Sequence, residues 1–439
     1  MNRRTICSKD FVLVAIGQII SIFGNQILRY ALPLYLLNQT GSSVLFGTIL
    51  AVSFIPMIIL FPIGGIIADR VNKRNIMVIL DFATAALILV FYVLSGYLDM
   101  IPLMAVTMMI LYGIQGAYQP AVKASVPALV DPEYMMQANS VVDMISSVAG
   151  MAGPVIGGLL FSVLGLNPIL WISMVCFFAS AVMEIFIHIP FERKEVTGNI
   201  VATGFHDLRD SFHFMLKKRP VLWKTAIIFA VTNLLLTSLV LIGLPVILTQ
   251  HLGFAADTAS RLYGYAQGVI AGGAILGGLL AGILSKHLSA KAAPMLLAGC
   301  CLSVILGGIA LQLAGNPMIT YILMLVGCGL LLTLHTLFQI QVMTYLQLLT
   351  PPDLIGKVIS CFMCVVMCTS PLGQFIYGMV FEHIGSSTYI PFYAAGLLML
   401  VITVAARKIF YNLDEAQKES ESEVADLDPD PEFPIGIIH

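Results

Sequence analysis

The side chains that could do chemistry in this chain are ionisable groups enclosed in long apolar stretches. Arg29 lies well inside the first stretch, one helical turn after Asn25, and Asp143 lies inside the fifth. If these stretches cross a membrane, each charge is expensive and by default indicates a functional role. Arg29 meets an anionic group on a substrate, pairs with a carboxylate or extends to the outer surface, and Asp143 either takes up a proton or braces a loop. For Asp81 we expect bracing, and for Glu184 a place at the membrane interface.

A charged turn separates the second apolar stretch from the third. Its marked residues are Gly65, Asp69, Arg70, Lys73 and Arg74. The glycine allows two helices to approach closely. The Asp69 carboxylate can accept hydrogen bonds from the amide end of a neighbouring helix, where the helix dipole favours a negative charge. The basic residues are typical of a cytoplasmic loop. We therefore interpret the turn as a cytoplasmic loop that also holds helices together.

Composition identifies the class of protein. Of the 439 residues, 59% are apolar and 10% are charged, and the mean hydropathy is +0.94. Soluble proteins carry about 25% charged residues. A hydrocarbon core of about 30 Å requires about 20 apolar residues per helix, and continuously apolar runs do not fit the alternating strands of a barrel. We predict an all-α integral membrane protein with twelve transmembrane helices, at approximately 11–37, 42–67, 76–97, 100–122, 137–164, 168–189, 222–249, 260–284, 292–313, 317–346, 356–383 and 387–410.

The basic residues predict the orientation of these spans. If the N-terminus lies inside, 20 of the 22 Lys and Arg residues fall on the cytoplasmic side, and only Arg29 and Arg261 do not. Cytoplasmic loops are enriched in such residues. We therefore expect a multi-pass protein with both termini cytoplasmic. The short basic start indicates a retained first helix rather than a cleaved signal peptide.

The two halves of the chain echo each other in sequence. Leu32-Pro33 matches Leu244-Pro245 at an offset of 212 residues, and Pro154 matches Pro371 at an offset of 217. Six plus six helices in parallel duplication are typical of alternating-access transporters. We divide the chain into an N-terminal six-helix bundle (1–190), a cytoplasmic linker loop (191–220), a C-terminal six-helix bundle (221–410) and a disordered acidic cytoplasmic tail (411–439).

The charged turn resembles the signature loop of the major facilitator superfamily, with Asn72 in place of the usual glycine. Segments around Gln119-Pro120-Ala121 and Gly356-Lys357-Val358 are similar to the branch that contains macrolide-efflux proteins and the enterobactin exporter. The resemblance implies the major facilitator fold, two pseudo-symmetric six-helix bundles. A further stretch resembles the core of the superfamily's antiporter motif, found in exporters: Gly153, Pro154, Gly157 and Gly158.

The resemblance also implies where a substrate binds. In the resembled fold the first, fourth, seventh and tenth helices line a cavity, and the fifth and eighth helices meet between the halves. The antiporter-motif residues and the glycines of the eighth helix would then form a sliding interface. Candidates for the substrate or proton pathway are Asn25, Arg29, Tyr112, Gln115, Gln119, Asp143, Asn233, His335 and Gln339. So sparsely polar a lining suits an amphipathic ligand better than a sugar, because unpaired buried polar groups are costly.

The implied function is export of amphipathic or lipophilic small molecules, of the macrolide or drug type, driven by the proton gradient. Tyr112 stands where proton-coupled drug exporters of the superfamily have an arginine, which leaves the coupling residue open. One alternative is a dedicated siderophore, lysolipid or nutrient carrier of the same fold. The other is a receptor or scaffold that transports nothing.

Several function classes lack their sequence signatures. The chain has no nucleotide-binding loop, no zinc-protease helix motif and no nucleophile elbow, so we do not expect an enzyme. We expect no cofactor, no metal and no nucleic-acid partner. The expected partners are a small-molecule substrate and the lipid bilayer, and the expected form is a monomer in the inner or plasma membrane of a bacterium.

Overall fold

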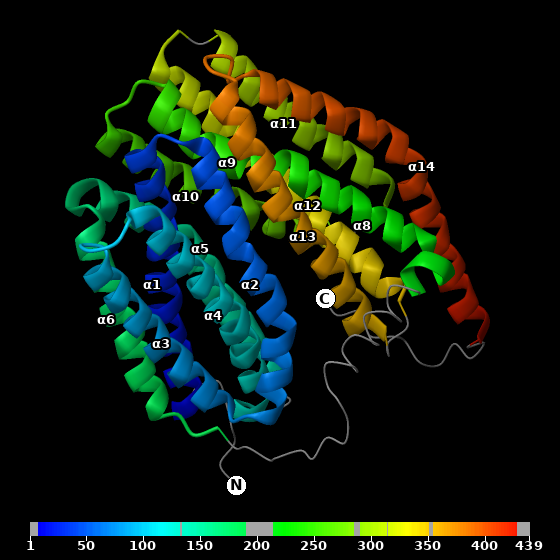
Figure 1. Ribbon diagram of the computed structural model, residues 1–439. Coiled ribbons are helices and arrows are strands. Elements are labelled where there is room, and N and C mark those ends of the chain that lie inside the picture. Colours follow the sequence, from blue (N-terminus) through cyan, green and yellow to red (C-terminus); the bar gives the residue numbers. More distant parts are fainter. Residues whose placement is uncertain are drawn as a thin grey trace.

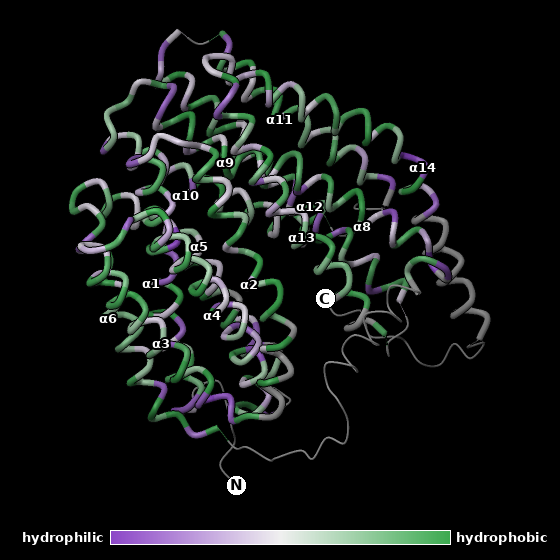
Figure 2. The backbone as a smooth tube through the Cα atoms, in the orientation of Figure 1, coloured by the Kyte–Doolittle hydropathy of each residue, from purple (hydrophilic) through white to green (hydrophobic). Residues whose placement is uncertain are grey.

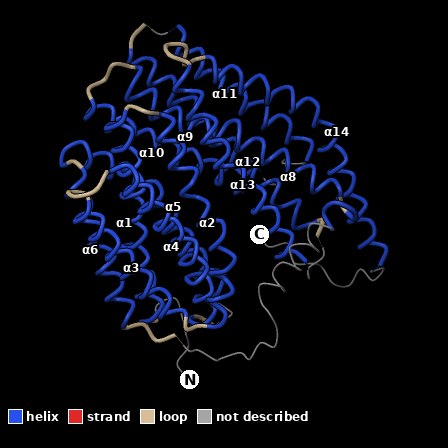
Figure 3. Tube along the Cα trace, viewed as in Figure 1, coloured by secondary structure: helices blue, strands red, loops and turns tan. Residues whose placement is uncertain are grey.

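The structure is a computed structural model that describes residues 8–131, 134–189, 214–284, 290–313, 315–350 and 354–427. Within these ranges every regular element is a helix, and Figure 3 shows only helices and connecting loops. Twelve of the described helices are long and apolar enough to cross a membrane. The predicted all-α integral membrane fold is therefore confirmed.

The first six spans form an N-terminal bundle. Ser8, Ser42 and Asn72 cap the first three helices by accepting a hydrogen bond from a backbone N–H, as short polar side chains do at helix N-termini. Gly41 ends the first helix with a left-handed backbone (φ 62°), which glycine adopts without steric cost. The six helices are α1 Lys9–Thr40, α2 Ser43–Arg70, α3 Lys73–Leu94, α4 Met100–Leu129, α5 Met135–Leu164 and α6 Leu166–Ile185.

The last six spans form a C-terminal bundle. Its first span, Pro220–His251, alternates between α-helix and π-helix, in the order α8 Pro220–Thr232, η3 Asn233–Thr237, α9 Ser238–Val246 and η4 Ile247–His251. Two short elements, η2 Phe214–Lys218 and η5 Ala290–Ala292, precede α8 and α11. The remaining spans are α10 Ala256–Leu284, α11 Ala293–Leu313, α12 Pro317–Leu348, α13 Ile355–His383 and α14 Ile390–Leu427.

The last helix is longer than the sequence predicted. We expected a disordered tail from residue 411, but α14 continues to Leu427. The segment 411–427 contains neither glycine nor proline, and the first proline of the tail is Pro429, so nothing in it interrupts a helix. The predicted tail from 428 onward and most of the predicted linker lie outside the described residues.

The two bundles touch at one end and diverge at the other, as Figure 1 shows. At the closed end, α5 meets α10 and α2 meets α13. A Cβ built on Gly158 would lie 2.8 Å from the Cα of Gly264, and one built on Gly378 would lie 3.2 Å from the Cα of Gly47. Such distances permit only glycine, because small residues let helix backbones approach closely. We call the end marked by these four glycines the closed end and the opposite end the open end.

Apolar residues run along the length of the helices, and hydrophilic residues gather at helix ends (Figure 2). Many large apolar side chains are exposed, for example Val163, Ile283 and Leu313 at 75% each. A surface of this kind faces lipid in a membrane protein. Buried polar side chains are common among the described residues, but the only buried carboxylates there are Asp81 and Glu184, so these two acids are exceptional.

Candidate functional site

A cavity of about 290 Å³ lies between the two bundles. It adjoins the closed end, because Pro154 and Tyr30 in its wall belong to the turns that approach α10 there. Helices of both halves contribute to it, and α1 contributes most. The lining residues are Gln26, Arg29, Tyr30, Pro33, Leu34, Phe46, Leu50, Phe54, Tyr112, Pro154, Leu241, Tyr263 and Gln267.

Arg29 is the charged group of this cavity. Its Nη1 donates a hydrogen bond to Oε1 of Gln115 at 2.5 Å, and its guanidinium carbon lies 4.0 Å from the centroid of the Tyr112 ring. The amide and the ring face of α4 therefore hold the guanidinium in place. Within the described part of the chain, Arg29 has no acidic partner. Of the two predicted placements of Arg29, the structure shows the inward one.

Aromatic rings form the wall of the cavity at the closed end. Tyr30 of α1 stacks on Tyr263 of α10, with ring centroids 5.1 Å apart. The Tyr30 hydroxyl donates to the backbone carbonyl of Ser260, and Gln267 Nε2 donates to the Tyr263 hydroxyl at 2.7 Å. Phe54 meets Tyr112 edge to face at 5.0 Å. The Tyr30–Tyr263 stack thus joins the two bundles beside the cavity, whereas Phe54 and Tyr112 both belong to the N-terminal bundle.

A carboxylate of α13 forms a second contact between the two bundles at the closed end. Glu382, near the end of α13, accepts hydrogen bonds from the Ser43 hydroxyl at 3.0 Å and from the Ser42 hydroxyl and the Val44 N–H at 3.2 Å. These donors form the N-terminus of α2, where the helix dipole favours a negative charge. The contact joins the two halves, and loss of the carboxylate charge would weaken it.

A second polar cluster is buried inside the N-terminal bundle. Asp81 of α3 is 2% exposed and Glu184 of α6 is fully buried. Ser21 donates to Oδ1 of Asp81 at 3.0 Å, and the Tyr118 hydroxyl donates to Oε1 of Glu184 at 2.8 Å. The other carboxyl oxygen of each residue has no hydrogen-bond partner. Glu184 lies one residue before the end of α6, and its side chain is covered by α1 and α4, so it does not face solvent; its expected depth near the membrane boundary stays a prediction.

The two polar regions approach each other at Gln115. A small cavity of about 20 Å³, enough for about one water molecule, separates α1, α3 and α4. Its polar lining consists of Ser21, Asn25, Asp81, Thr84, Gln115, Tyr118 and Gln119. Gln115 lines this cavity and also accepts the hydrogen bond from Arg29. Gln115 thus contacts Arg29 of the central cavity and faces the small cavity that Asp81 also lines.

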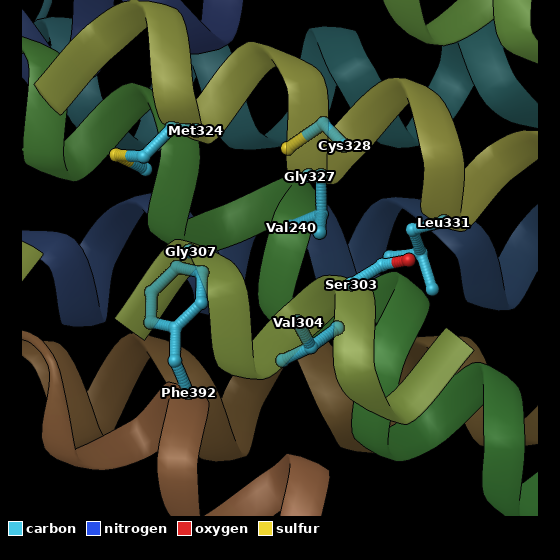
Figure 4. A pocket seen from close by; sticks show the side chains of 9 residues that line it. All are labelled: Val240, Ser303, Val304, Gly307, Met324, Gly327, Cys328, Leu331 and Phe392. Atoms are coloured by element: carbon cyan, nitrogen blue, oxygen red, sulfur yellow. The ribbon is translucent and has the colours of Figure 1, made fainter. Parts of the chain in front are cut away.

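The candidates of the C-terminal half lie elsewhere. Asn233 donates to the Phe229 carbonyl of its own helix at 3.1 Å. His335 is buried with its ring 5.4 Å from that of Phe229, and neither it nor Gln339 lines the two cavities described above. A pocket that does lie in this half holds only about 10 Å³, and Figure 4 shows its mainly apolar side chains, such as Val240 and Phe392. None of the described residues that line the main cavity belongs to α12, so the expected contribution of the tenth helix stays a prediction.

The charged turn is described only in part. The side chains of Gly65, Asp69 and Arg70, like that of Asp143, lie outside the described residues, so the predictions about them stay predictions. Lys73 begins α3. The Arg74 guanidinium donates to the backbone carbonyls of Glu184 and Ile185, which places a positive charge at the C-terminal end of α6, where the helix dipole favours it.

The antiporter-motif residues divide between two neighbours. Gly158 and Pro154 face α10, whereas Gly153 and Gly157 face α1: Cβ atoms built there would lie 2.5 Å from the Gln26 Cβ and 3.4 Å from the Ile27 Cα. The glycines of the eighth span divide in the same way. Gly268 faces α5, Gly273 and Gly277 face α12, and Gly272 and Gly278 have open space.

Sequence reasoning missed several of these residues. Tyr30, Tyr263 and Gln267 carried no signal beyond helical spacing on α1 and α10, since tyrosine and glutamine also occur in ordinary helix contacts. Glu184 did carry one, because a carboxyl in an apolar run indicates function by default. Its position near a helix end suggested an exposed interfacial side chain instead, whereas packing by other helices buries it.

Comparison with known proteins agrees with this geometry. The family model of the Major Facilitator Superfamily matches residues 14–368. The chain is 23% identical over 403 residues to "Macrolide efflux protein A" of Streptococcus pyogenes, covering 91% of this chain and 95% of that protein. It is 27% identical over 154 residues to "Enterobactin exporter EntS" of Shigella boydii, covering 35% and 37%.

Solved structures share the fold. A bacterial homologue of the human lysosomal transporter Spinster, solved in an inward-facing and unoccupied conformation, superposes with a TM-score of 0.66 at 14% sequence identity, covering 93% of this chain and 97% of that one. At such low identity the likeness concerns the fold alone. The family model, which spans most of the chain, shows that this multi-pass membrane protein belongs to the Major Facilitator Superfamily.

Proposed function

We propose that the protein is a secondary exporter of amphipathic small molecules that works by alternating access. The observation that carries the proposal is the central cavity of about 290 Å³, which lies between two duplicated bundles whose described residues approach each other closely at the closed end. Transporters built from such repeats hold their substrate between the halves and open alternately to either side. The relatives named for macrolide efflux and enterobactin export support the outward direction.

The predicted orientation gives the state of the molecule. With the basic loops in the cytoplasm, the closed end faces outward and the cavity belongs to an inward-facing state. The aromatic contacts of Tyr30 and Tyr263 and the Glu382 contact would break when the outer end opens. The charged turn around Asp69 lies at the opposite end, and we assign to it the latch of the outward-facing state.

The lining of the cavity supports an amphipathic cargo. Leu34, Phe46, Leu50 and Phe54 provide an apolar wall, and a few polar groups stand among aromatic rings. Ligand sites of this type bury an apolar body and orient it with a small number of polar contacts. A cargo rich in hydroxyl groups would leave many of them unpaired here, which is costly.

The buried acids support the proton gradient as the energy source. Asp81 and Glu184 belong to one buried cluster, because Tyr118, which donates to Glu184, lines the same small cavity as Asp81. No basic side chain among the described residues forms an ion pair with either acid. Two adjacent carboxylates in a low-dielectric interior repel each other strongly, so a proton bound by one of them relieves the repulsion. Gln115, which accepts the hydrogen bond from Arg29, faces the small cavity that Asp81 also lines.

The test is accumulation of a panel of fluorescent amphiphiles in a bacterial host that lacks its own efflux pumps. We expect wild-type cells to accumulate less of at least one compound than cells with empty vector, and a protonophore to abolish the difference. The Asp81→Asn/Glu184→Gln variant should behave like the protonophore-treated wild type. Equal accumulation in all cells across anionic, neutral and cationic compounds would contradict the proposed function.

A further inference from the structure

We infer that the central cavity selects amphiphiles that carry one anionic group, and that Arg29 binds that group. The inference rests on the proposed function, because it names the cargo class of the same cavity. Carboxylates, sulfonates and phosphate esters share the required chemistry, which is a negative charge with oxygen acceptors attached to an apolar body.

Charge balance is the first argument. Arg29 is the one charged side chain among the described residues that line the cavity, and it has no acidic partner among the described side chains. An uncompensated charge at membrane depth is expensive. An anionic cargo supplies the missing counter-charge, whereas a neutral cargo leaves the guanidinium uncompensated and a cationic cargo adds repulsion.

The geometry of the guanidinium is the second argument. Its one described hydrogen bond uses Nη1, toward Gln115, and a guanidinium has five N–H donors in a fixed fork. The Tyr112 ring supports one face of the group at 4.0 Å. The side chain is therefore held in position while most of its donors remain for a ligand, and such a fork matches the oxygens of an anionic group.

The surroundings of Arg29 limit the cargo to one charge. The duplication places Leu241 at the position equivalent to Arg29, at the offset of 212 residues, and Leu241 lines the same cavity. Of these two equivalent positions, only the one in the N-terminal half carries a positive charge. The apolar residues of α2, namely Phe46, Leu50 and Phe54, lie on the same cavity wall and suit the body of the cargo.

A matched pair of fluorescent probes tests the inference. The anion 8-anilinonaphthalene-1-sulfonate and the neutral N-phenyl-1-naphthylamine share their ring system and differ in the sulfonate. Each is titrated into purified full-length protein in nanodiscs, and the signal of empty nanodiscs is subtracted. We expect the wild type to bind the sulfonate about tenfold or more tightly than the neutral probe, since a charge-assisted hydrogen bond contributes that much.

Variants assign the preference to Arg29. We expect Arg29→Gln to weaken binding of the sulfonate by about tenfold or more while changing that of the neutral probe little, and Arg29→Lys to retain part of the preference. Arg261→Gln removes the same charge from an exposed position on α10 and should leave both affinities unchanged. An unchanged sulfonate affinity in folded Arg29→Gln protein, or equal wild-type affinities for the two probes, would overturn the inference.

Flux separates this inference from the proposed function. In proteoliposomes, probe movement is followed for the same proteins. Arg29-dependent binding without flux would support the anion site and contradict the proposed transport function. Flux of the neutral probe that is the same in wild-type and Arg29→Gln protein would support the transport function and contradict the anion site. If Arg29→Gln does not fold, the wild-type comparison of the two probes still decides.

Discussion

The two bundles have one architecture and different chemistry. Among the described residues, the buried carboxylates, Asp81 and Glu184, both lie in the N-terminal bundle, and so does Arg29 in the cavity. The corresponding interior of the C-terminal bundle is filled by the rings of Phe229, Phe338 and Phe362. The two duplicated halves therefore share one helical architecture, whereas the charged groups are concentrated in the N-terminal half.

This difference indicates a division of work. A charged group in a membrane interior indicates a function by default, so under the proposed function ion and cargo binding belong to the N-terminal bundle. The C-terminal bundle contributes Leu241, Tyr263 and Gln267 to the cavity and otherwise acts as a packed body. Rocking of one body against the other is what alternating access requires.

The largest expected effect concerns the buried acids. The Asp81→Asn/Glu184→Gln variant keeps the shape of the cluster and removes both charges, so concentrative export should fall to background. Exchange of labelled cargo across proteoliposomes without a gradient should continue at close to the wild-type rate, because it requires no net proton movement. Loss of both activities in a folded protein would indicate a structural role and contradict the division of work.

The second prediction moves the cavity charge to the other bundle. In the Arg29→Leu/Leu241→Arg variant the charge is conserved, but Gln115 and Tyr112 no longer position it. We expect affinity for the anionic probe to drop by about tenfold. The Arg29→Leu variant alone serves as the reference. Restored wild-type affinity in the swapped protein would show that the two halves are interchangeable.

The third prediction concerns the contact between the bundles. A leucine at Gly158 cannot fit, because even its Cβ would lie 2.8 Å from the Gly264 Cα. Overpacking costs about 1–3 kcal/mol, which would shift the population about five- to 150-fold toward the state that is open at this end. Labelling of cysteines introduced near the closed end should increase and export should fall. Gly278→Leu, at a position on α10 with open space, is the control and should change neither.

The smallest expected effect is in the C-terminal core. His335 is buried with Nε2 unpartnered and its ring close to Phe229. His335→Phe should raise the free energy of unfolding by about 1 kcal/mol, because it removes an unsatisfied polar atom, and should leave export unchanged. Thermal unfolding and the accumulation assay check both statements. A marked loss of export would return His335 to the transport pathway.

The fold was predictable from sequence because lipid imposes a simple rule: each span needs about 20 apolar residues, and the runs are long and separated. That rule does not apply to the helical segment 411–427, because this segment is polar. It is nevertheless helical, and it contains no helix breaker. Arg29 could be predicted as a site residue because it is a charge within an apolar run, and Tyr112 because of its position in the fourth helix.

Other parts of the site depend on packing between distant segments. The spacing of glycines does not show which neighbouring helix each of them faces. Gly153 and Gly158 were therefore both predicted at the interface between the halves, although they face different helices. The stacking of Tyr30 on Tyr263 joins residues from two bundles. The burial of Glu184 results from α1 and α4 and not from its own helix.

The most direct test of the central claim measures cargo flux and proton flux together. Wild-type protein in proteoliposomes is given a gradient of 8-anilinonaphthalene-1-sulfonate, and the internal pH is followed with a trapped indicator. We predict that probe movement drives proton movement in the opposite direction, and that the Asp81→Asn/Glu184→Gln variant moves probe without protons. Wild-type probe flux with no accompanying pH change would contradict proton-coupled export through the N-terminal bundle.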